Sequence, residues 1–350
     1  MSEIRGVRYA AVLEFFRAHV PGAADTGALE FELIGDGRSN ITYRVSAGER
    51  SWVLRRPPLG HVLPTAHDMA REFRVIAALV DTPVPVPRAL ALCEDTKVND
   101  APFYVMEYTP GVIVGGSKLP EGFAEKPAER RAMSLALVDT LVALHAIDPD
   151  TVGLRTFGRP EGYVERQVRR WSQQWERSST GPLPEIDELI RRLGAALPVS
   201  PPPAIVHGDY RLGNMALDPA DPSRVIAVFD WEMATLGDPL ADLGYTLIYW
   251  ADPGEEAGTL PGVESGPGML TRAEIVAEYA QRSGRDVAAV DFYQVLALYK
   301  LAIISEGIYA RFVAGQTLGD QFAGTTRQTG ALARRALTIA DASPDAKLRG

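Results

Sequence analysis

Residues 205–244 contain I-V-H-G-D-Y-R-L-G-N-M-A-L and, after a turn rich in Asp and Pro, V-I-A-V-F-D-W-E-M-A-T-L-G-D-P-L-A-D-L-G. Two short apolar runs, residues 204–206 and 225–229, predict β-strands in this part of the chain. Each strand delivers an aspartate to the start of a loop, Asp209 after the first strand and Asp230 after the second. The stretch is therefore organised around two loop carboxylates.

Asn214 lies five residues after Asp209, and the residues that follow it predict a hairpin with a strand at 215–217 and a turn at 218–223. Such a hairpin would bring the two carboxylates and the amide into one small volume. Oxygen ligands of this kind suit hard cations, and phosphoryl transfer depends mainly on positioning and on neutralising phosphate charge. We therefore expect Asn214 and Asp230 to bind Mg2+, and Asp209 to accept the proton of an attacking hydroxyl.

The order H-x-D-x-x-x-x-N, followed by a strand and an aspartate, resembles the catalytic loop and metal aspartate of protein kinases. Gly208 replaces the arginine of that motif, and Trp231-Glu232 follow Asp230 where kinases have Phe-Gly. With H-G-D and the downstream G-D-P-x-x-D-L, the stretch resembles the aminoglycoside phosphotransferase family, a small-molecule branch of the kinase fold. The resemblance implies an α+β, two-lobed protein-kinase-like fold, with a small antiparallel-sheet lobe and a larger, mainly helical lobe. The alternative is a set of turns that carry Asp and Asn only as caps.

Composition narrows the class of protein. The chain has 350 residues, of which 46% are hydrophobic and 23% charged, as in a soluble globular enzyme large enough for two lobes. The net charge of −9 argues against nucleic-acid binding and would suit a cationic acceptor or simple solubility. Cys93 is the only cysteine, which excludes an intrachain disulfide, and the five scattered histidines disfavour a zinc site. We expect a cytoplasmic protein without a membrane partner, because no signal-peptide core or apolar run of ~20 residues is present. The oligomeric state is not indicated.

The first part of the chain predicts one helix and three strands, at residues 8–20, 31–34, 41–45 and 51–55. A glycine-containing loop at residues 35–40 joins the first two strands. The order strand–loop–strand does not fit a Rossmann or Walker phosphate site, which needs a helix after the loop. It resembles the loop that covers nucleotide phosphates in kinases, which implies that Ser39 and Asn40 lie over the phosphates. An ordinary hairpin turn is the alternative.

Arg55 stands where the corresponding kinase strand carries a lysine that contacts the phosphates and pairs with a glutamate of the next helix. Arginine stays charged and can contact two oxygens at once, so it can serve the same purpose with different geometry. Arg56 is the alternative, because successive residues of a strand point to opposite faces. We expect the next helix to be capped by Thr65 and to carry Glu72 as the partner of Arg55. A solvated surface glutamate is the competing interpretation.

The apolar strand at residues 103–108 runs into Pro110-Gly111 and resembles the kinase hinge. By that resemblance Glu107 and Tyr108 contact adenine through their main chain, and Met106 packs behind the base. A plain edge strand would look similar. The expected organisation is an N-terminal nucleotide-binding lobe at residues 1–108, a C-terminal, mainly helical catalytic and acceptor lobe at 109–342 and a frayed tail at 343–350.

Several polar residues near the motif are expected to support the loop. Asp238 and the following proline predict a helix N-terminus, and Asp242 falls in the first turn, where a carboxylate complements the helix dipole. We expect His207 to brace the catalytic loop by hydrogen bonding. His145, at the end of another predicted helix, is expected to be a packed or capping residue.

The acceptor site is the least determined part. Trp171 and Trp175 repeat at helical spacing and predict core packing, with the wall of an acceptor pocket as the alternative. Residues 251–269 predict a long loop rich in Gly, Pro and Glu, which we interpret as a lid near the acceptor. Lys300, on a predicted helix at 288–313, could reach the acceptor, but surface pairing is the simpler expectation.

The resemblance implies a phosphotransferase that uses ATP and Mg2+ to phosphorylate a hydroxyl of a small molecule. The segment L-R-R-P-P-L-G-H-V-L-P-T-A-H-D-M-A-R-E-F-R-V-I at residues 54–76 also resembles the kinase-like domains joined to acyl-CoA dehydrogenases. That second resemblance implies a hydroxyacyl thioester as the acceptor. Two alternatives stay open, namely an aminoglycoside- or choline-type kinase and a catalytically silent kinase-fold module that only binds nucleotide.

Overall fold

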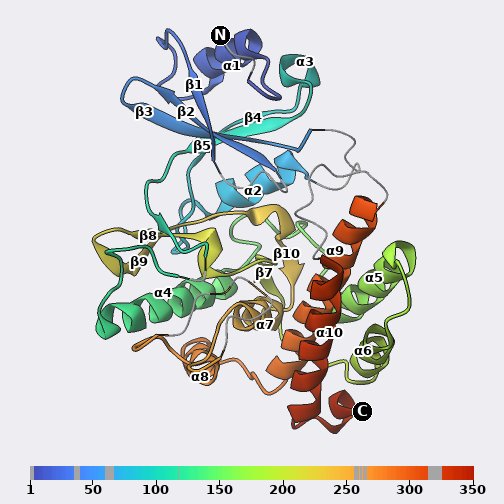
Figure 1. Cartoon of the computed structure of the whole chain (residues 1–350). Coiled ribbons are helices and arrows are strands. Elements are labelled where there is room, and N and C mark those ends of the chain that lie inside the picture. Colours follow the sequence, from blue (N-terminus) through green and yellow to red (C-terminus); the bar gives the residue numbers. More distant parts are fainter. Residues whose placement is uncertain are drawn as a thin grey trace.

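A computed structural model of the chain describes residues 4–34, 40–59, 67–116, 118–255, 260, 262, 266–313 and 325–350. Figure 1 shows a sheet-containing part, which carries the N-terminus, stacked on a larger and mainly helical part, which carries the C-terminus. This is the α+β architecture that the sequence predicts. Serine 39, one of the expected phosphate-loop residues, lies outside the described residues, as does most of the loop at 35–40.

The smaller part is built on a five-stranded antiparallel sheet with the order β1-β2-β3-β5-β4. Its strands are β1 (Glu30–Ile34), β2 (Ile41–Ala47), β3 (Arg50–Arg56), β4 (Ala89–Cys93) and β5 (Phe103–Glu107). Three helices accompany the sheet, namely α1 (Tyr9–His19), α2 (Met69–Leu79) and α3 (Thr96–Asn99). The strands expected at 31–34, 41–45 and 51–55 are confirmed and extend by one or two residues.

Alternation along β3 decides which arginine faces the inside of the molecule. Trp52 and Leu54 pack with α1 in one apolar cluster, whereas Val53 packs with α2 in the other. Because neighbouring residues of a strand point to opposite faces, Arg55 shares the α2 face with Val53. Arg56 points to the α1 face, where its guanidinium donates hydrogen bonds to the main-chain oxygens of Pro57 and Gly6.

Helix α2 begins later than the sequence suggests. Thr65, the expected cap, lies outside the described residues, and the helix starts at Met69 with Asp68 as its N-cap. The Asp68 carboxylate accepts a hydrogen bond of 2.9 Å from the backbone N–H of Arg71. Glu72 is not a solvated surface residue, since only 1% of its area is exposed.

The larger part consists of α4 (Pro127–Ala146), α5 (Tyr163–Ser178), α6 (Pro184–Ala195), α7 (Leu240–Ile248), α8 (Arg272–Ser283), α9 (Val290–Val313), α10 (Thr325–Ala342) and α11 (Ala346–Arg349). Helix α9 packs against α5, α7 and α10, and this bundle contains Trp171 and Trp175 in its core, as expected. Residues 343–350 were expected to be frayed, but they contain helix α11, which buries Leu348. None of the described helices is both long and apolar enough to cross a membrane.

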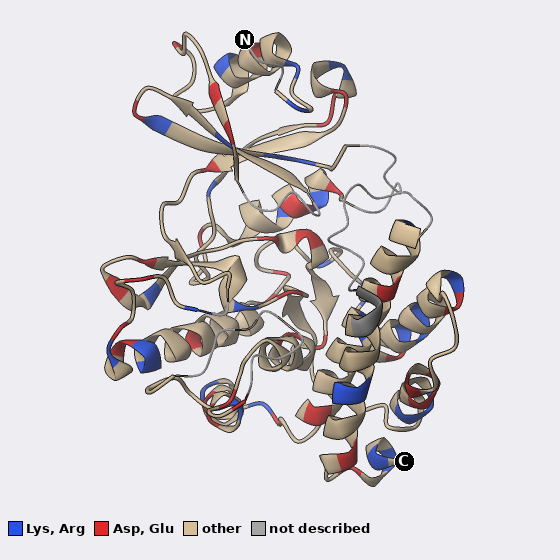
Figure 2. Cartoon of the chain, in the orientation of Figure 1, with Lys and Arg blue, Asp and Glu red and all other residues tan. Residues whose placement is uncertain are grey.

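Two small sheets hold the motif. Strand β7 (Ala204–Val206) pairs with β10 (Thr235–Gly237), and β8 (Met215–Asp218) pairs with β6 (Val112–Ile113) on one side and β9 (Asp221–Val228) on the other. The predicted hairpin is therefore confirmed as β8–β9. It turns the chain back so that the loops after β7 and β9 lie at one end of the larger part, facing the sheet (Figure 1). Basic and acidic residues are interspersed along both parts (Figure 2).

Candidate functional site

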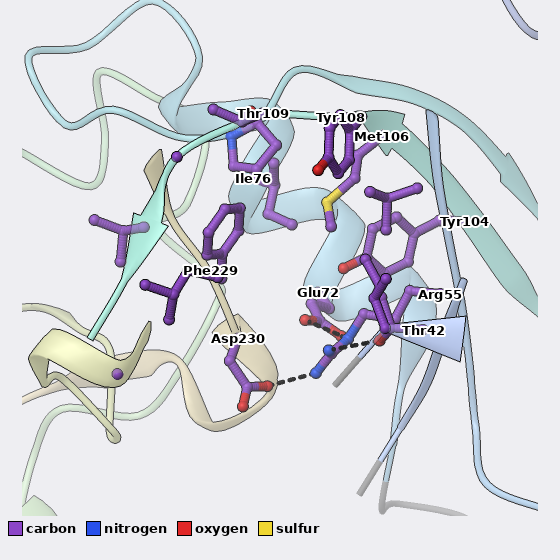
Figure 3. A pocket seen from close by; sticks show the side chains of 17 residues that line it. Thr42, Arg55, Glu72, Ile76, Tyr104, Met106, Tyr108, Thr109, Phe229 and Asp230 are labelled. Carbon is purple, nitrogen blue, oxygen red and sulfur yellow. Dashed lines mark hydrogen bonds and ion pairs between the residues drawn. The ribbon is translucent and has the colours of Figure 1, made fainter. Parts of the chain in front are cut away.

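A cavity of about 370 Å³ lies where the five-stranded sheet meets the β8–β9 hairpin. One end is apolar and is formed by Met106, Ile76 and Phe229, while the other carries the charged side chains of Arg55 and Asp230 (Figure 3). Its volume is within the range of small-molecule sites. An apolar slot that ends in charged groups can hold a planar base at one end and phosphates at the other.

Arg55 joins two carboxylates at the charged end. Its Nε lies 3.0 Å from Oε1 of Glu72, and its Nη2 donates to Oδ1 of Asp230 (Figure 3). Nη1 donates to the hydroxyl of Thr42 at 3.2 Å. The ion pair expected between Arg55 and Glu72 is thus present, and the arginine links the sheet to the loop after β9.

The charges at this end are not balanced. Burial raises the pKa of Glu72 to about 7, although the Arg55 guanidinium lowers it. Burial also raises the pKa of Asp230, Arg55 opposes the rise, and the negative charges of Glu232 and Asp209 add to it. Burial alone would lower the pKa of Arg55, but its carboxylate neighbours raise it, so this arginine stays charged. A further cation beside Asp230 would relieve the excess negative charge.

The loop after β7 brings Asp209 and Asn214 into direct contact. Nδ2 of Asn214 donates to Oδ2 and to the main-chain oxygen of Asp209, both at 2.8 Å. The backbone oxygen of Asn214 accepts the N–H of Phe229 at 2.8 Å, which ties this loop to the residue before Asp230. Asp230 adopts a left-handed conformation, with φ of 64°. The two carboxylates and the amide that the sequence singled out therefore come from adjoining loops.

Asn214 and Asp230 have oxygen atoms that could bind a cation which also binds phosphate. Within the described ranges no three His, Cys, Asp or Glu side chains are grouped as metal ligands. Mg2+ is usually held by one or two protein carboxylates together with substrate phosphates and water, so it does not need such a group. The Asn214 side chain uses its nitrogen to hold Asp209, so its oxygen is the atom that could bind a metal. In this structure the Asp230 carboxylate contacts the positive charge of Arg55.

Asp242 supports the loop after β7, which carries Asp209. Its carboxylate accepts the backbone N–H groups of His207 and Gly208, each at 2.7 Å, and lies 3.3 Å from Nε2 of His145. The side chain of His207 bonds the main-chain oxygen of Phe229 at 2.8 Å, so it braces the two loops against each other. Burial lowers the pKa of His145, which favours its neutral form.

Asn40, which was expected to lie over the phosphates, is held by a partner that the sequence did not suggest. Its Nδ2 donates to Oε2 of Glu232 at 2.9 Å, and its Oδ1 lies 2.9 Å from Nδ1 of His67. Glu232 is also 3.9 Å from Arg55. Only the position of Glu232, two residues after Asp230, could have pointed to this contact. A 3-10 turn (η2, Trp231–Met233) lies there and returns the Glu232 side chain toward the site.

The expected hinge residues divide into two groups. Met106 and Tyr108 line the cavity, together with Thr109 (Figure 3). Glu107 is not a lining residue, and its side chain is exposed. Its backbone N–H donates to the oxygen of Arg88 at 2.9 Å, so this donor is not available to a base.

Two cations lie close to the Asp209 loop, of which Arg211 was not singled out from the sequence and Lys300 was expected to form a surface pair. Nε of Arg211 lies 3.3 Å from Oδ1 of Asp209. Lys300 does not form the expected surface pair, because its Nζ donates to the main-chain oxygen of Gly208 at 3.1 Å. Burial lowers the pKa of Lys300, whereas the charges of Asp209 and Asp242 raise it. Residues 251–269, the predicted lid, are described only in part.

Known proteins resemble this chain in sequence and in fold. The profile of the family described as "Phosphotransferase enzyme family" matches residues 30–293. Acyl-CoA dehydrogenase family member 11 of Rattus norvegicus is 35% identical over 353 residues, which cover 96% of this chain and 44% of that protein. A solved structure of a candidate aminoglycoside phosphotransferase from Ralstonia eutropha matches with a TM-score of 0.82 and 32% identity, covering 96% of this chain and 99% of that one.

A thermostable variant of an aminoglycoside phosphotransferase, solved with ADP and hygromycin B, shares the fold with a TM-score of 0.56 at 15% identity. That match covers 89% of this chain and 96% of the other. The chain spans less than half the length of the curated relatives it matches.

Proposed function

Because the chain belongs to the phosphotransferase enzyme family, we propose that it transfers the γ-phosphate of ATP to a hydroxyl group of a small molecule. One observation carries the proposal, namely the contact of Asp209 with Asn214 at 2.8 Å in a loop that adjoins Asp230. A carboxylate, an amide and a second carboxylate in this order supply a proton acceptor and two oxygen ligands.

Asp209 is the proposed base. Its two oxygens already accept hydrogen bonds from Arg211 and Asn214, which fix the orientation of the carboxylate. Each carboxylate oxygen has a second lone pair, so Asp209 can still accept the proton of an acceptor hydroxyl. The loop is held in place through Asp242, which bonds the two backbone N–H groups before Asp209. Orientation of the hydroxyl is the larger part of this role.

The cavity at the sheet is the proposed nucleotide site. Met106, Tyr108 and the main chain of Glu107 would hold the adenine at its apolar end. At the charged end Arg55 would contact the phosphates while Glu72 keeps the guanidinium in position. Ser39 and Asn40 would lie over the phosphates. In this proposal residues 1–108 form the nucleotide-binding lobe and residues 109–342 the catalytic and acceptor lobe.

Asn214 and Asp230 are the proposed Mg2+ ligands. Magnesium bound there neutralises charge on the phosphate oxygens. Asp230 contacts Arg55 in this structure, so binding of the metal requires that the guanidinium turns from this carboxylate toward the phosphates. Glu72 would remain beside Arg55 during this turn, so that the arginine keeps an ion-pair partner.

The relative named acyl-CoA dehydrogenase family member 11 suggests the acceptor. Its name refers to acyl thioesters, and this chain matches less than half of its length. We therefore propose a hydroxyacyl thioester as the acceptor. The alternatives are an aminoglycoside and a choline-like amino alcohol, which solved structures of the same fold are named for.

The test is release of ADP from MgATP by the purified chain with hydroxyacyl thioesters, amino alcohols and aminoglycosides. We expect turnover that depends on a hydroxylated acceptor and a phosphorylated product that mass spectrometry identifies. Nucleotide binding is followed in parallel by thermal unfolding, since ligand at 100 times its Kd adds roughly 2.7 kcal/mol of stability. Stabilisation by MgATP without turnover on any acceptor would instead support a silent nucleotide-binding module.

A further inference from the structure

Two cations of the chain flank the proposed base Asp209. The guanidinium of Arg211 lies 3.3 Å from its carboxylate, and the ammonium group of Lys300 donates to the oxygen of the preceding residue, Gly208, at 3.1 Å. The two side chains come from different elements, since Arg211 follows β7 and Lys300 lies on α9. Two positive charges therefore lie close to the carboxylate that receives the acceptor hydroxyl in the proposed function.

The aromatic rings near these cations are already in use. The Lys300 ammonium lies 4.9 Å from the ring centre of Tyr245 and 6.0 Å from that of Trp171. The Arg211 guanidinium lies 5.0 Å from the ring centre of Tyr249. A ring face that a cation of the protein already covers is not open to a ligand cation. These rings therefore do not form a free box for a quaternary or primary ammonium group.

The nearby carboxylates are also paired. The two oxygens of Asp209 accept from Arg211 and Asn214. Those of Asp242 accept the backbone N–H groups of Gly208 and His207, and one of them also contacts the ring of a buried histidine. An ammonium group brought here would meet two like charges and acids that already have partners. Like charges placed side by side are a strong means of rejecting a ligand.

We infer that Lys300 and Arg211 are specificity-determining residues, which select acceptors that present carbonyl or carboxylate oxygens beside the reacting hydroxyl and reject acceptors that carry ammonium groups there. The inference rests on the proposed function, because it assumes that Asp209 receives the acceptor hydroxyl. It goes beyond that proposal by assigning the choice of acceptor to two named side chains. Among the alternatives it excludes choline-like and aminoglycoside acceptors.

The test compares three acceptors of equal chain length: a hydroxyacyl thioester, the corresponding hydroxycarboxylate and the corresponding amino alcohol. For the wild-type chain with MgATP we expect kcat/KM for the better of the two oxygen-bearing acceptors to exceed that for the amino alcohol by roughly 100-fold or more. Equal values, or a preference for the amino alcohol, would overturn the inference but leave the phosphotransferase intact. Turnover of none of them would contradict both proposals.

Variants assign the preference to the two residues. Lys300→Met keeps the length of the side chain and removes its charge, and it should reduce the preference by about tenfold, whereas Lys300→Arg should retain it. The ratio of the two kcat/KM values cancels any general loss of activity from the missing bond to Gly208. Arg211→Gln provides a second, independent variant with the same expected direction, and Lys347→Met, at an exposed position on α11, is the matched control. An unchanged ratio in both Lys300→Met and Arg211→Gln would refute the assignment.

Discussion

Replacement of Asp242 by asparagine should destabilise the protein and slow phosphoryl transfer at the same time. The carboxylate is fully buried and accepts the backbone N–H groups of His207 and Gly208 at 2.7 Å. An asparagine side chain has one oxygen and one NH2 group, so at least one of these N–H donors would face another donor. A hydrogen bond to a charged group contributes about 1.5–3 kcal/mol, and a donor left buried without a partner adds to the loss. We expect a total loss of about 2–4 kcal/mol.

The assay is urea denaturation of the wild type, Asp242→Asn and a control, Asp25→Asn. Asp25 is exposed, and a surface substitution should change the free energy of unfolding by less than about 0.5 kcal/mol. The kcat of Asp242→Asn should also fall, because the loop that carries Asp209 loses its support. A variant as stable as the control, or a destabilised variant with unchanged kcat, would refute the role assigned to this carboxylate.

Three further predictions concern residues around the same loop. Burial lowers the pKa of His145, so this histidine binds a proton more readily in the unfolded chain than in the folded chain. The protein should therefore lose stability as the pH falls below about 6.5. Urea midpoints at about pH 5 and about pH 8 should differ less for His145→Gln than for the wild type. Gly208→Ala should cost roughly 1–3 kcal/mol of stability in the same assay, because φ is +85° and the new Cβ would lie 2.7 Å from Cβ of Met233 in η2, whereas Gly181→Ala, in open space, should be nearly neutral. Arg55→Met should weaken MgATP binding by about tenfold or more in calorimetry, and Arg50→Met, at the exposed end of the same strand, should not.

Much of the site could be predicted from local sequence. The short apolar runs before Asp209 and Asp230 have the length and turn signals of buried strands, and the hairpin between them follows from its Asp-Pro turn. Alternation along β3 was enough to place Arg55 and Arg56 on opposite faces. In each case the information lies within about ten residues of the feature, which is the range of strand and turn signals.

The remaining part of the site depends on contacts between distant segments. Lys300 meets Gly208 across 92 positions of the chain, and Asn40 meets Glu232 across 192. A lysine on a helix has the same local pattern whether it faces solvent or a catalytic loop, because only the packing of α9 decides which face is buried. Similarly, Asp242 has the position of a helix-dipole partner in the sequence, but its bonds to His207 and Gly208 depend on where the fold places α7 relative to the loop after β7.

The measurement that tests the central claim most directly is kcat and MgATP affinity for Asp209→Asn with an acceptor that the wild type phosphorylates. Asparagine retains an oxygen that can accept the 2.8 Å bond from Asn214, so the loop should keep its shape while the proton acceptor is lost. We expect kcat to fall on the order of 10²–10⁴-fold and the Kd for MgATP to change by less than about twofold. Unchanged turnover, or loss of nucleotide binding in this variant, would contradict the assignment of Asp209 as the base.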